Sequence, residues 1–189
     1  MQGISEHNKD TEKKILSQLR NPQSFERGFR LLVNEYKERL YWHIRNMVTH
    51  HVDADEVLQN TFIKVFKGFK NFRGDAKLFT WLYRIATNES ISFLNKRKKR
   101  ATVDIDNSDI GLTHVLKADT YFDSERATVL LNNALEILPI KQKQVFIMRY
   151  YDQLTYKEIS ATLDTSVGGL KASYHHAVKK IEAYLKANI

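Results

Sequence analysis

The sequence contains no cysteine, and only 2 of its 189 residues are proline and 7 are glycine. The absence of cysteine excludes disulfide bonds and thiolate metal sites. So few prolines and glycines leave long segments able to continue as helices. No apolar run is long enough to cross a bilayer, and residues 1–11 lack the apolar core of a signal peptide. We therefore expect a soluble cytoplasmic protein without membrane insertion.

Positive charge is in excess and unevenly distributed. The chain has 30 Lys and Arg against 22 Asp and Glu, a formal net charge of +8 and a pI of about 9.5. This balance favours an anionic partner such as nucleic acid. Residues 101–124 are acidic instead, since this segment contains five aspartates and a single lysine, Lys117. Helical periodicity weakens there, which predicts a flexible acidic linker.

Apolar residues recur at helical spacing on both sides of this linker and predict an all-α protein with two small domains. We expect an N-terminal lead-in over 1–20, a first helical domain over 21–100, the linker over 101–124 and a second helical domain over 125–189. In the first domain we expect one helix to begin near Asp53 and another to run from about Ala76 to Arg100.

The second domain contains the pattern of a helix-turn-helix. Thr155 and Glu158 have the spacing of a capping box, with Leu154 and Ile159 placed for a hydrophobic staple. Polar residues then favour a turn, and Ser166 can cap the next helix. One face of that next helix is apolar. The other carries small, basic and hydrogen-bonding residues suited to a DNA groove: Ser166, Gly168, Lys171, Ala172, His175, His176 and Lys179.

The first domain interleaves aromatic and basic side chains between residues 69 and 100. Aromatic rings beside cations suit single-stranded nucleic acid, because exposed bases stack while phosphates pair with Lys and Arg. The alternative is that Phe72, Phe79 and Trp81 belong to the core, which the size of Trp81 favours. The basic run 96–100 also fits a solvated helix C-terminus.

These motifs together resemble a bacterial RNA polymerase sigma factor of the extracytoplasmic function (ECF) group of the sigma-70 family. The segment 53–66 is similar to the family segment that docks on the polymerase clamp coiled coil. Residues 72–75 and 79–88 match the segment that captures the melted minus-ten strand. The second domain matches the one that reads the minus-thirty-five element. The resemblance thus implies a sigma-2-like bundle joined to a sigma-4-like helix-turn-helix domain.

The resemblance also implies roles for individual residues. Asn88 takes the position of the pocket for an extruded minus-ten base, and Asp55, Glu56, Gln59 and Ile63 face polymerase. The helix-turn-helix residues named above face the minus-thirty-five DNA. Contacts to minus-ten DNA are implied for Phe72, Arg73, Lys77, Tyr83, Arg84, Asn88, Lys96, Arg97, Lys98 and Arg100.

The function implied is promoter recognition, strand opening and transcription initiation for a stress, cell-envelope or nutrient-signal regulon. The implied partners are core RNA polymerase, through its clamp coiled coil and flap, promoter DNA and an anti-sigma factor. No catalytic activity, metal or cofactor is expected. Departures from the family pattern include Asn60 for an acidic residue, Gln153 for a glycine, and His175 and His176 for an aromatic and an arginine.

Two other classes of function fit parts of the sequence. A repressor or response-regulator output domain needs only the helix-turn-helix, and it leaves the aromatic and basic first domain unexplained. A metal-dependent phosphohydrolase would use His50, His51, Asp53 and Asp55. Adjacent histidines on a helix point about 100° apart, so they rarely share a metal.

Overall fold

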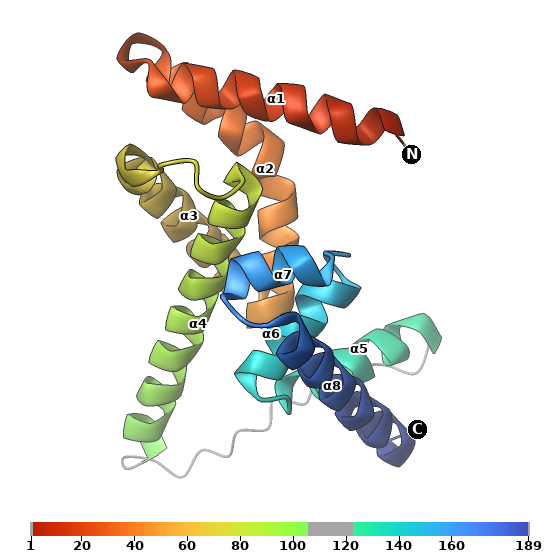
Figure 1. Cartoon of the computed structure of the whole chain (residues 1–189). Helices are drawn as coiled ribbons and strands as arrows, with labels where there is room; N and C mark the ends of the chain where they lie inside the picture. Colours follow the sequence, from red (N-terminus) through yellow and green to blue (C-terminus); the bar gives the residue numbers. More distant parts are fainter. Residues whose placement is uncertain (1, 106–122, 189) are drawn as a thin grey trace.

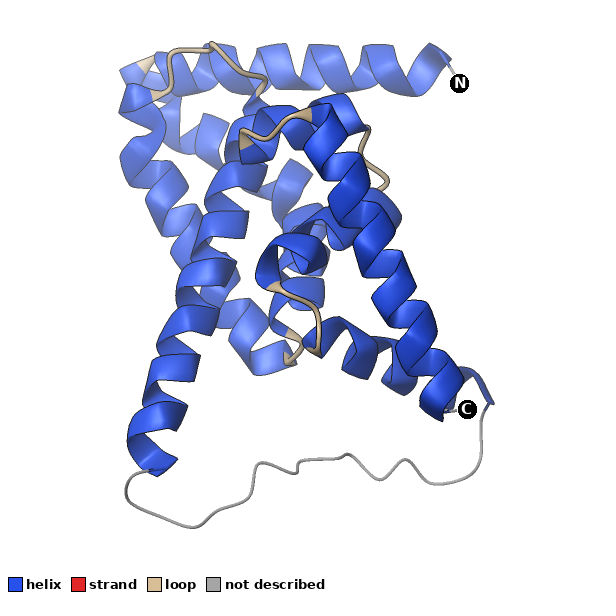
Figure 2. Cartoon of the chain, turned by 60° about the horizontal axis from the view of Figure 1, so that its bottom comes forward, coloured by secondary structure: helices blue, strands red, loops and turns tan. Residues whose placement is uncertain are grey.

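The chain forms an all-helical structure, seen in a computed structural model that describes residues 2–105 and 123–188 (Figures 1 and 2). In the first part, the helices are α1 (Gln2–Arg20), α2 (Phe25–Val48), α3 (His51–Gly68) and α4 (Leu78–Ile105), with short 3₁₀ turns at Pro22–Ser24 and Phe69–Asn71. The second part contains α5 (Asp123–Glu136), α6 (Ile140–Tyr150), α7 (Tyr156–Leu163) and α8 (Val167–Asn188). Within these described ranges no helix has the length and apolarity of a membrane span.

Helix α2 is the centre of the first domain, because it packs against α1, α3 and α4. Its residues Leu32, Leu40, Ile44 and Met47 are fully buried and recur at helical spacing. This confirms the helical spacing of apolar residues predicted for the first domain. Two of the expected helix starts differ slightly: α3 begins at His51 and α4 at Leu78.

The predicted polar lead-in forms the helix α1, which runs from Gln2 to Arg20. Ile15 and Leu19 of α1 are buried against the bundle, and the Glu12 carboxylate accepts a hydrogen bond from the Leu78 backbone N–H at 2.9 Å. That bond satisfies one of the free donors at the N-terminus of α4. Helix α1 therefore caps the helix that carries most of the predicted minus-ten residues.

The second domain packs α8 against α5, α6 and α7. Its own core contains Ala134, Leu135, Phe146, Ala177 and Ile181. The ring of Phe146 stacks on Tyr174 of α8 with centroids 5.8 Å apart. These contacts fix the direction in which α8 leaves the domain.

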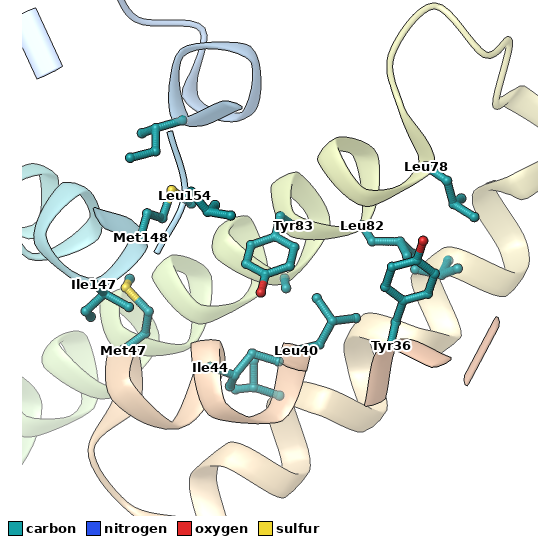
Figure 3. Close-up of a cluster of buried hydrophobic side chains, with 14 of the residues drawn as sticks. Tyr36, Leu40, Ile44, Met47, Leu78, Leu82, Tyr83, Ile147, Met148 and Leu154 are labelled. Atoms are coloured by element: carbon teal, nitrogen blue, oxygen red, sulfur yellow. The ribbon is translucent and has the colours of Figure 1, made fainter. Parts of the chain in front are cut away.

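The two domains share one hydrophobic core instead of being held together only by a tether. Helix α6 packs against α2, and α7 packs against α4. Figure 3 shows Met47 and Ile44 of α2 beside Ile147 and Met148 of α6, with Leu154 approaching Tyr83. The predicted linker is also shorter than expected at its N-terminal end, because α4 continues to Ile105 without a glycine or proline to stop it. Residues 106–122 lie outside the described parts.

The contact between α1 and α2 depends on Gly28. A Cβ atom there would lie 2.8 Å from the Leu19 backbone nitrogen and 2.9 Å from Gln18 Cβ. Because backbone must then move, we expect Gly28→Ala to destabilise the protein by about 1–3 kcal/mol. Urea unfolding measures this loss. Gly168→Ala is the matched control, since a Cβ at Gly168 meets nothing within 4 Å; a cost equal to that of Gly28→Ala would contradict the close packing.

Two positions flanking the first helix of the helix-turn-helix adopt positive φ. Gln153 has φ 55° and Asp164 has φ 51°, a region of backbone conformation that favours glycine. Asp tolerates this region better than Gln. We expect Gln153→Gly to stabilise the protein by about 0.5–1 kcal/mol and Asp164→Gly by less. In the same urea assay, Gln59→Gly inside α3 should cost about 1 kcal/mol. Equal effects at Gln153 and Gln59 would refute the backbone explanation.

Candidate nucleic-acid interface

The helix-turn-helix forms as its local sequence predicts. The Thr155 hydroxyl accepts from the Glu158 N–H at 3.3 Å, and Glu158 accepts from the Thr155 N–H at 2.9 Å, completing the capping box. Ser166 caps α8 by accepting from the Gly169 N–H at 3.2 Å. Leu154 and Ile159 are both buried, as a hydrophobic staple requires.

One face of α8 is exposed along its N-terminal half. Leu170, Ala177 and Ile181 are buried against the domain, which turns the predicted DNA-facing residues to solvent. These exposed residues are Ser166, Gly168, Lys171, Ala172, His175, His176 and Lys179. Lys171 Nζ lies 5.9 Å from the ring centre of Tyr156, so α7 helps to position it. The face presents cations and hydrogen-bonding groups without an arginine.

The aromatic residues before α4 form a packed cluster. Phe72 lies 5.0 Å from Trp81 and 5.8 Å from Phe69, measured between ring centres, and Phe69 is buried. Phe72 and Trp81 are half-buried. The prediction that these aromatic residues belong to the core therefore holds for the faces of the rings that pack together. Part of the Phe72 ring stays exposed beside the loop. Arg73 and Lys77 are exposed on that loop.

Tyr83 does not lie on a DNA-accessible surface in this arrangement, although it was predicted to contact minus-ten DNA. Only 1% of its surface is exposed, and its ring packs 4.2 Å from Phe79 and 4.9 Å from His43. Burial strongly raises the pKa of its phenol, as does the nearby Asp152 carboxylate. Helical spacing placed it opposite the apolar face of α4, but the second domain covers that side.

Arg84 and Asn88 face the second domain across a cleft. The Arg84 side chain donates to the carbonyl oxygens of Ala161 and Thr162 in the last turn of α7. Asn88 lines the same cleft together with Lys141 and Asp164. The predicted minus-ten pocket and the helix-turn-helix domain therefore meet in space.

The basic end of α4 projects from the bundle. Lys96, Lys98 and Arg100 are exposed, and Arg97 donates to Asp53 of α3 at 3.1 Å. Arg97 thus has a structural partner in addition to its predicted role on DNA. Lys96, Lys98 and Arg100 stay predicted contacts to the nucleic-acid backbone.

The predicted polymerase-binding residues form an exposed stripe on α3: Asp55, Glu56, Gln59 and Ile63. Ile63 and Gln59 border an apolar groove with Phe29, Phe62 and Phe66, and 47% of Phe66 is exposed.

Sequence reasoning missed Trp42 and Val52, which expose 55% and 81% of their surfaces. Val52 follows His51 in α3, and the ring of Trp42 in α2 packs edge-on against Tyr41, which contacts His51. In the sequence, Trp42 and Val52 each stand out only as an apolar residue that does not fit the helical spacing of the buried face.

Three of the four residues of the phosphohydrolase alternative, His51, Asp53 and Asp55, are engaged with other groups. His51 contacts Asp55 and the Tyr41 hydroxyl, and Asp53 pairs with Arg97. Among residues 10–100 and 127–188, whose side chains the structure describes, no group of three or more His, Asp or Glu side chains is arranged to hold a metal ion.

The fold and these exposed faces define a two-domain, all-helical nucleic-acid-binding protein. Two family profiles match the chain: Sigma-70 region 2 over residues 32–100 and Sigma-70 region 4 over residues 128–181. The chain belongs to the sigma-70 family, within its ECF group. The two matched segments coincide with the first and second domains.

Individual relatives agree with this assignment. The chain is 29% identical over 170 residues to the ECF RNA polymerase sigma-E factor of Haemophilus influenzae, covering 85% of this chain and 88% of that protein. It is 28% identical over 168 residues to the sigma-E factor of Escherichia coli K12, covering 83% and 86%.

Solved structures share the fold. CnrH, in complex with the cytosolic domain of CnrY, aligns with a TM-score of 0.67 and 19% identity over 95% of this chain and 97% of that one. The sigma factor RpoE of Bartonella quintana, in complex with the anti-sigma factor NepR, aligns with a TM-score of 0.65 and 22% identity, covering 85% and 98%.

Lys179 lies on the exposed face of α8 and is one of the residues predicted to bind minus-thirty-five DNA; a contact of this lysine with a phosphate can be tested by its effect on salt dependence. We expect Lys179→Ala to weaken duplex DNA binding about equally for all sequences and to reduce the salt slope of log K by about 1. Fluorescence anisotropy at several salt concentrations measures both. Lys186→Ala, near the far end of the same helix, is the control for lost charge; an equal change in slope there would remove Lys179 from the interface.

Proposed function

We propose that this protein is a promoter-specificity subunit of RNA polymerase. It binds core polymerase through α3, reads minus-ten DNA with α4 and its preceding loop, and reads minus-thirty-five DNA with α8. It has no catalytic activity of its own and acts in the bacterial cytoplasm. A stress, cell-envelope or nutrient-signal regulon fits its similarity to sigma-E factors.

One observation carries the proposal: a single chain presents three exposed surfaces of different chemistry in the order that the sigma-70 family uses. The α3 stripe is acidic and apolar, which suits a protein partner. The loop and α4 combine half-buried aromatic rings with cations, which suits unpaired bases and phosphates. The α8 face suits the major groove of duplex DNA. A regulator that used only α8 would need neither of the other two surfaces.

An anti-sigma factor is a further proposed partner. Two solved structures of the same fold are complexes with such proteins or with a cytosolic domain of another chain. The apolar groove beside Phe29 and Phe66 offers a surface for an amphipathic segment.

The test is transcription by core polymerase of the source bacterium, with and without the full chain, from a library of its genomic fragments. Sequencing the transcripts identifies any promoters used. We expect defined start sites only when the protein is present. Asn88→Ala should reduce initiation about 10- to 100-fold, since a lost base contact costs about 1–3 kcal/mol. Core binding should remain intact because Asn88 lines the cleft toward the second domain and is not part of the α3 stripe.

Asn95→Ala is the matched control, because it is the same residue type, also exposed, two turns further along α4. It should initiate as well as the unchanged protein. Absence of core binding and of any stimulated transcript would refute the proposal. Tight duplex binding that is independent of residues 25–100 would favour a simple repressor instead.

A further inference from the structure

An open groove lies at the end of the first domain where the turn between α1 and α2 meets the C-terminal end of α3 (Figure 1). Its volume is about 800 Å³, within the ~300–1,000 Å³ typical of ligand sites. We name it the Phe25 groove after a ring in its lining. The lining comes from both sides of the groove and includes Arg20, Pro22, Phe25, Lys67, Lys70 and Phe72. Among these residues only Phe72 has a role in the promoter reading proposed above.

Aromatic rings line the Phe25 groove and connect it to the loop proposed to hold minus-ten DNA. The ring of Phe25 lies 6.0 Å from Phe69, and Phe69 lies 5.8 Å from Phe72, measured between ring centres. Phe25 also meets Phe66 edge-on at 5.3 Å, and 47% of Phe66 is exposed. A strand held by the loop at Phe72 therefore finds a second aromatic surface two ring contacts away.

Three exposed cations surround these rings: Arg20, Lys67 and Lys70. In the parts of the chain that the structure describes, none of the three forms an ion pair with a carboxylate. Lys64, on the same helix as Lys67, does pair with Glu89. No acidic residue is among the described residues that line the groove. This excess of positive charge favours an anionic ligand.

The turn after α1 places Arg20 against the proposed minus-ten loop. Asn21 caps the 3₁₀ turn that follows it, and the Ser24 hydroxyl donates to the Gln18 carbonyl oxygen of α1 at 3.0 Å. A Cβ atom built at Gly74 would lie 3.4 Å from Arg20 Nη2, so the guanidinium lies beside the backbone of the loop. A guanidinium held in this way can donate two N–H groups to one phosphate.

Two neighbouring grooves at α3 differ in chemistry. The groove beside Phe29, Gln59 and Ile63 adjoins the acidic stripe and suits a protein partner. The Phe25 groove instead has cations around its rings, and lysine is depleted at protein interfaces. Sites for single-stranded nucleic acid combine stacking rings with a positively charged groove that follows the phosphates. The chemistry of the Phe25 groove therefore favours a nucleic-acid strand over a protein.

We propose that the Phe25 groove binds a second unpaired nucleotide of the promoter strand, next to the one held by the loop at Phe72. Its base stacks on Phe25, while Arg20 and Lys70 contact its phosphate. Because the described lining residues include no amide or carboxylate side chain, the site accepts any base. This proposal rests on the function proposed above and gives the end of α1 a part in strand binding.

The first test measures binding of a fluorescently labelled strand of about 20 deoxythymidines to the full chain by anisotropy. Phe25→Leu keeps an apolar side chain but removes the ring, so we expect the affinity to fall about 5- to 20-fold, as for the loss of one stacked base. Phe29→Leu is the matched control, because Phe29 is half-buried in the same aromatic cluster but lines only the neighbouring groove. It should bind the strand as tightly as the unchanged protein, and urea unfolding checks that the two variants lose similar stability.

The second test probes the phosphate contact without changing the core. Arg20→Ala and Lys70→Ala should each reduce the salt slope of log K for the same strand by about 0.7, the value for one phosphate contact on a single strand. Lys14→Ala removes the same charge from an exposed site on α1 that does not line the groove. It should leave the slope unchanged.

Each outcome decides the proposal. Equal strand affinity of Phe25→Leu and Phe29→Leu, or equal salt slopes of Arg20→Ala and Lys14→Ala, would overturn it. Weaker core polymerase binding by Arg20→Ala with unchanged strand affinity would assign the groove to a protein partner and overturn it as well. So would competition by free thymidine monophosphate at the concentration at which the strand binds, since the site would then take free nucleotides.

Failure of promoter reading has a different signature. The unchanged protein would then leave core polymerase unstimulated on every genomic fragment. The loss of strand affinity in Phe25→Leu, compared with Phe29→Leu, would still decide whether the Phe25 groove binds a nucleotide.

Discussion

Burial of α2 along its whole length is the constraint on which the rest of the structure depends. Its N-terminal half packs on α1 and α3, and its C-terminal half, through Ile44, Met47 and Val48, packs on α4 and α6. One helix therefore contributes to the cores of both domains. Because apolar burial is the main favourable term in folding, separating the domains exposes part of the surface that stabilises α2. The position of the helix-turn-helix is for this reason coupled to the stability of the first domain.

The shared core explains why apolar packing alone is not enough at this boundary. Met47, Ile147 and Met148 are flexible or branched side chains that tolerate small shifts. A polar pair between His43 and Asp152 tolerates much less, because each atom must meet its partner at hydrogen-bond distance. Opening the domains gives both groups water in exchange, so the contact favours one closed geometry without making closure irreversible. Buried polar contacts are better evidence for a defined arrangement than for high stability.

The features that could be predicted from the sequence are those that depend on interactions between residues close together in the chain. The capping box at Thr155, the Ser166 cap and the apolar face of α8 each depend on residues within a few positions, and the structure confirms them. The His43–Asp152 contact joins residues 109 positions apart, and no periodicity signals it. Tyr83 illustrates the same limit: helical spacing placed it on the polar side of α4, but its ring packs on His43 of α2, which lies 40 positions away in the sequence. Helix α1 was underestimated because its buried residues are few and its partner glycine, Gly28, lies in another helix.

The placement of Tyr83 connects folding with DNA reading. Its neutral, buried phenol packs on His43 of α2 and Phe79 of α4, so it stabilises the packing of these two helices in the first domain. Arg84 and Asn88, which follow Tyr83 on α4, are exposed, and they are the residues proposed to meet the minus-ten strand. Burial of Tyr83 in the first-domain core holds α4 against α2 and so fixes the side of α4 on which these two residues lie.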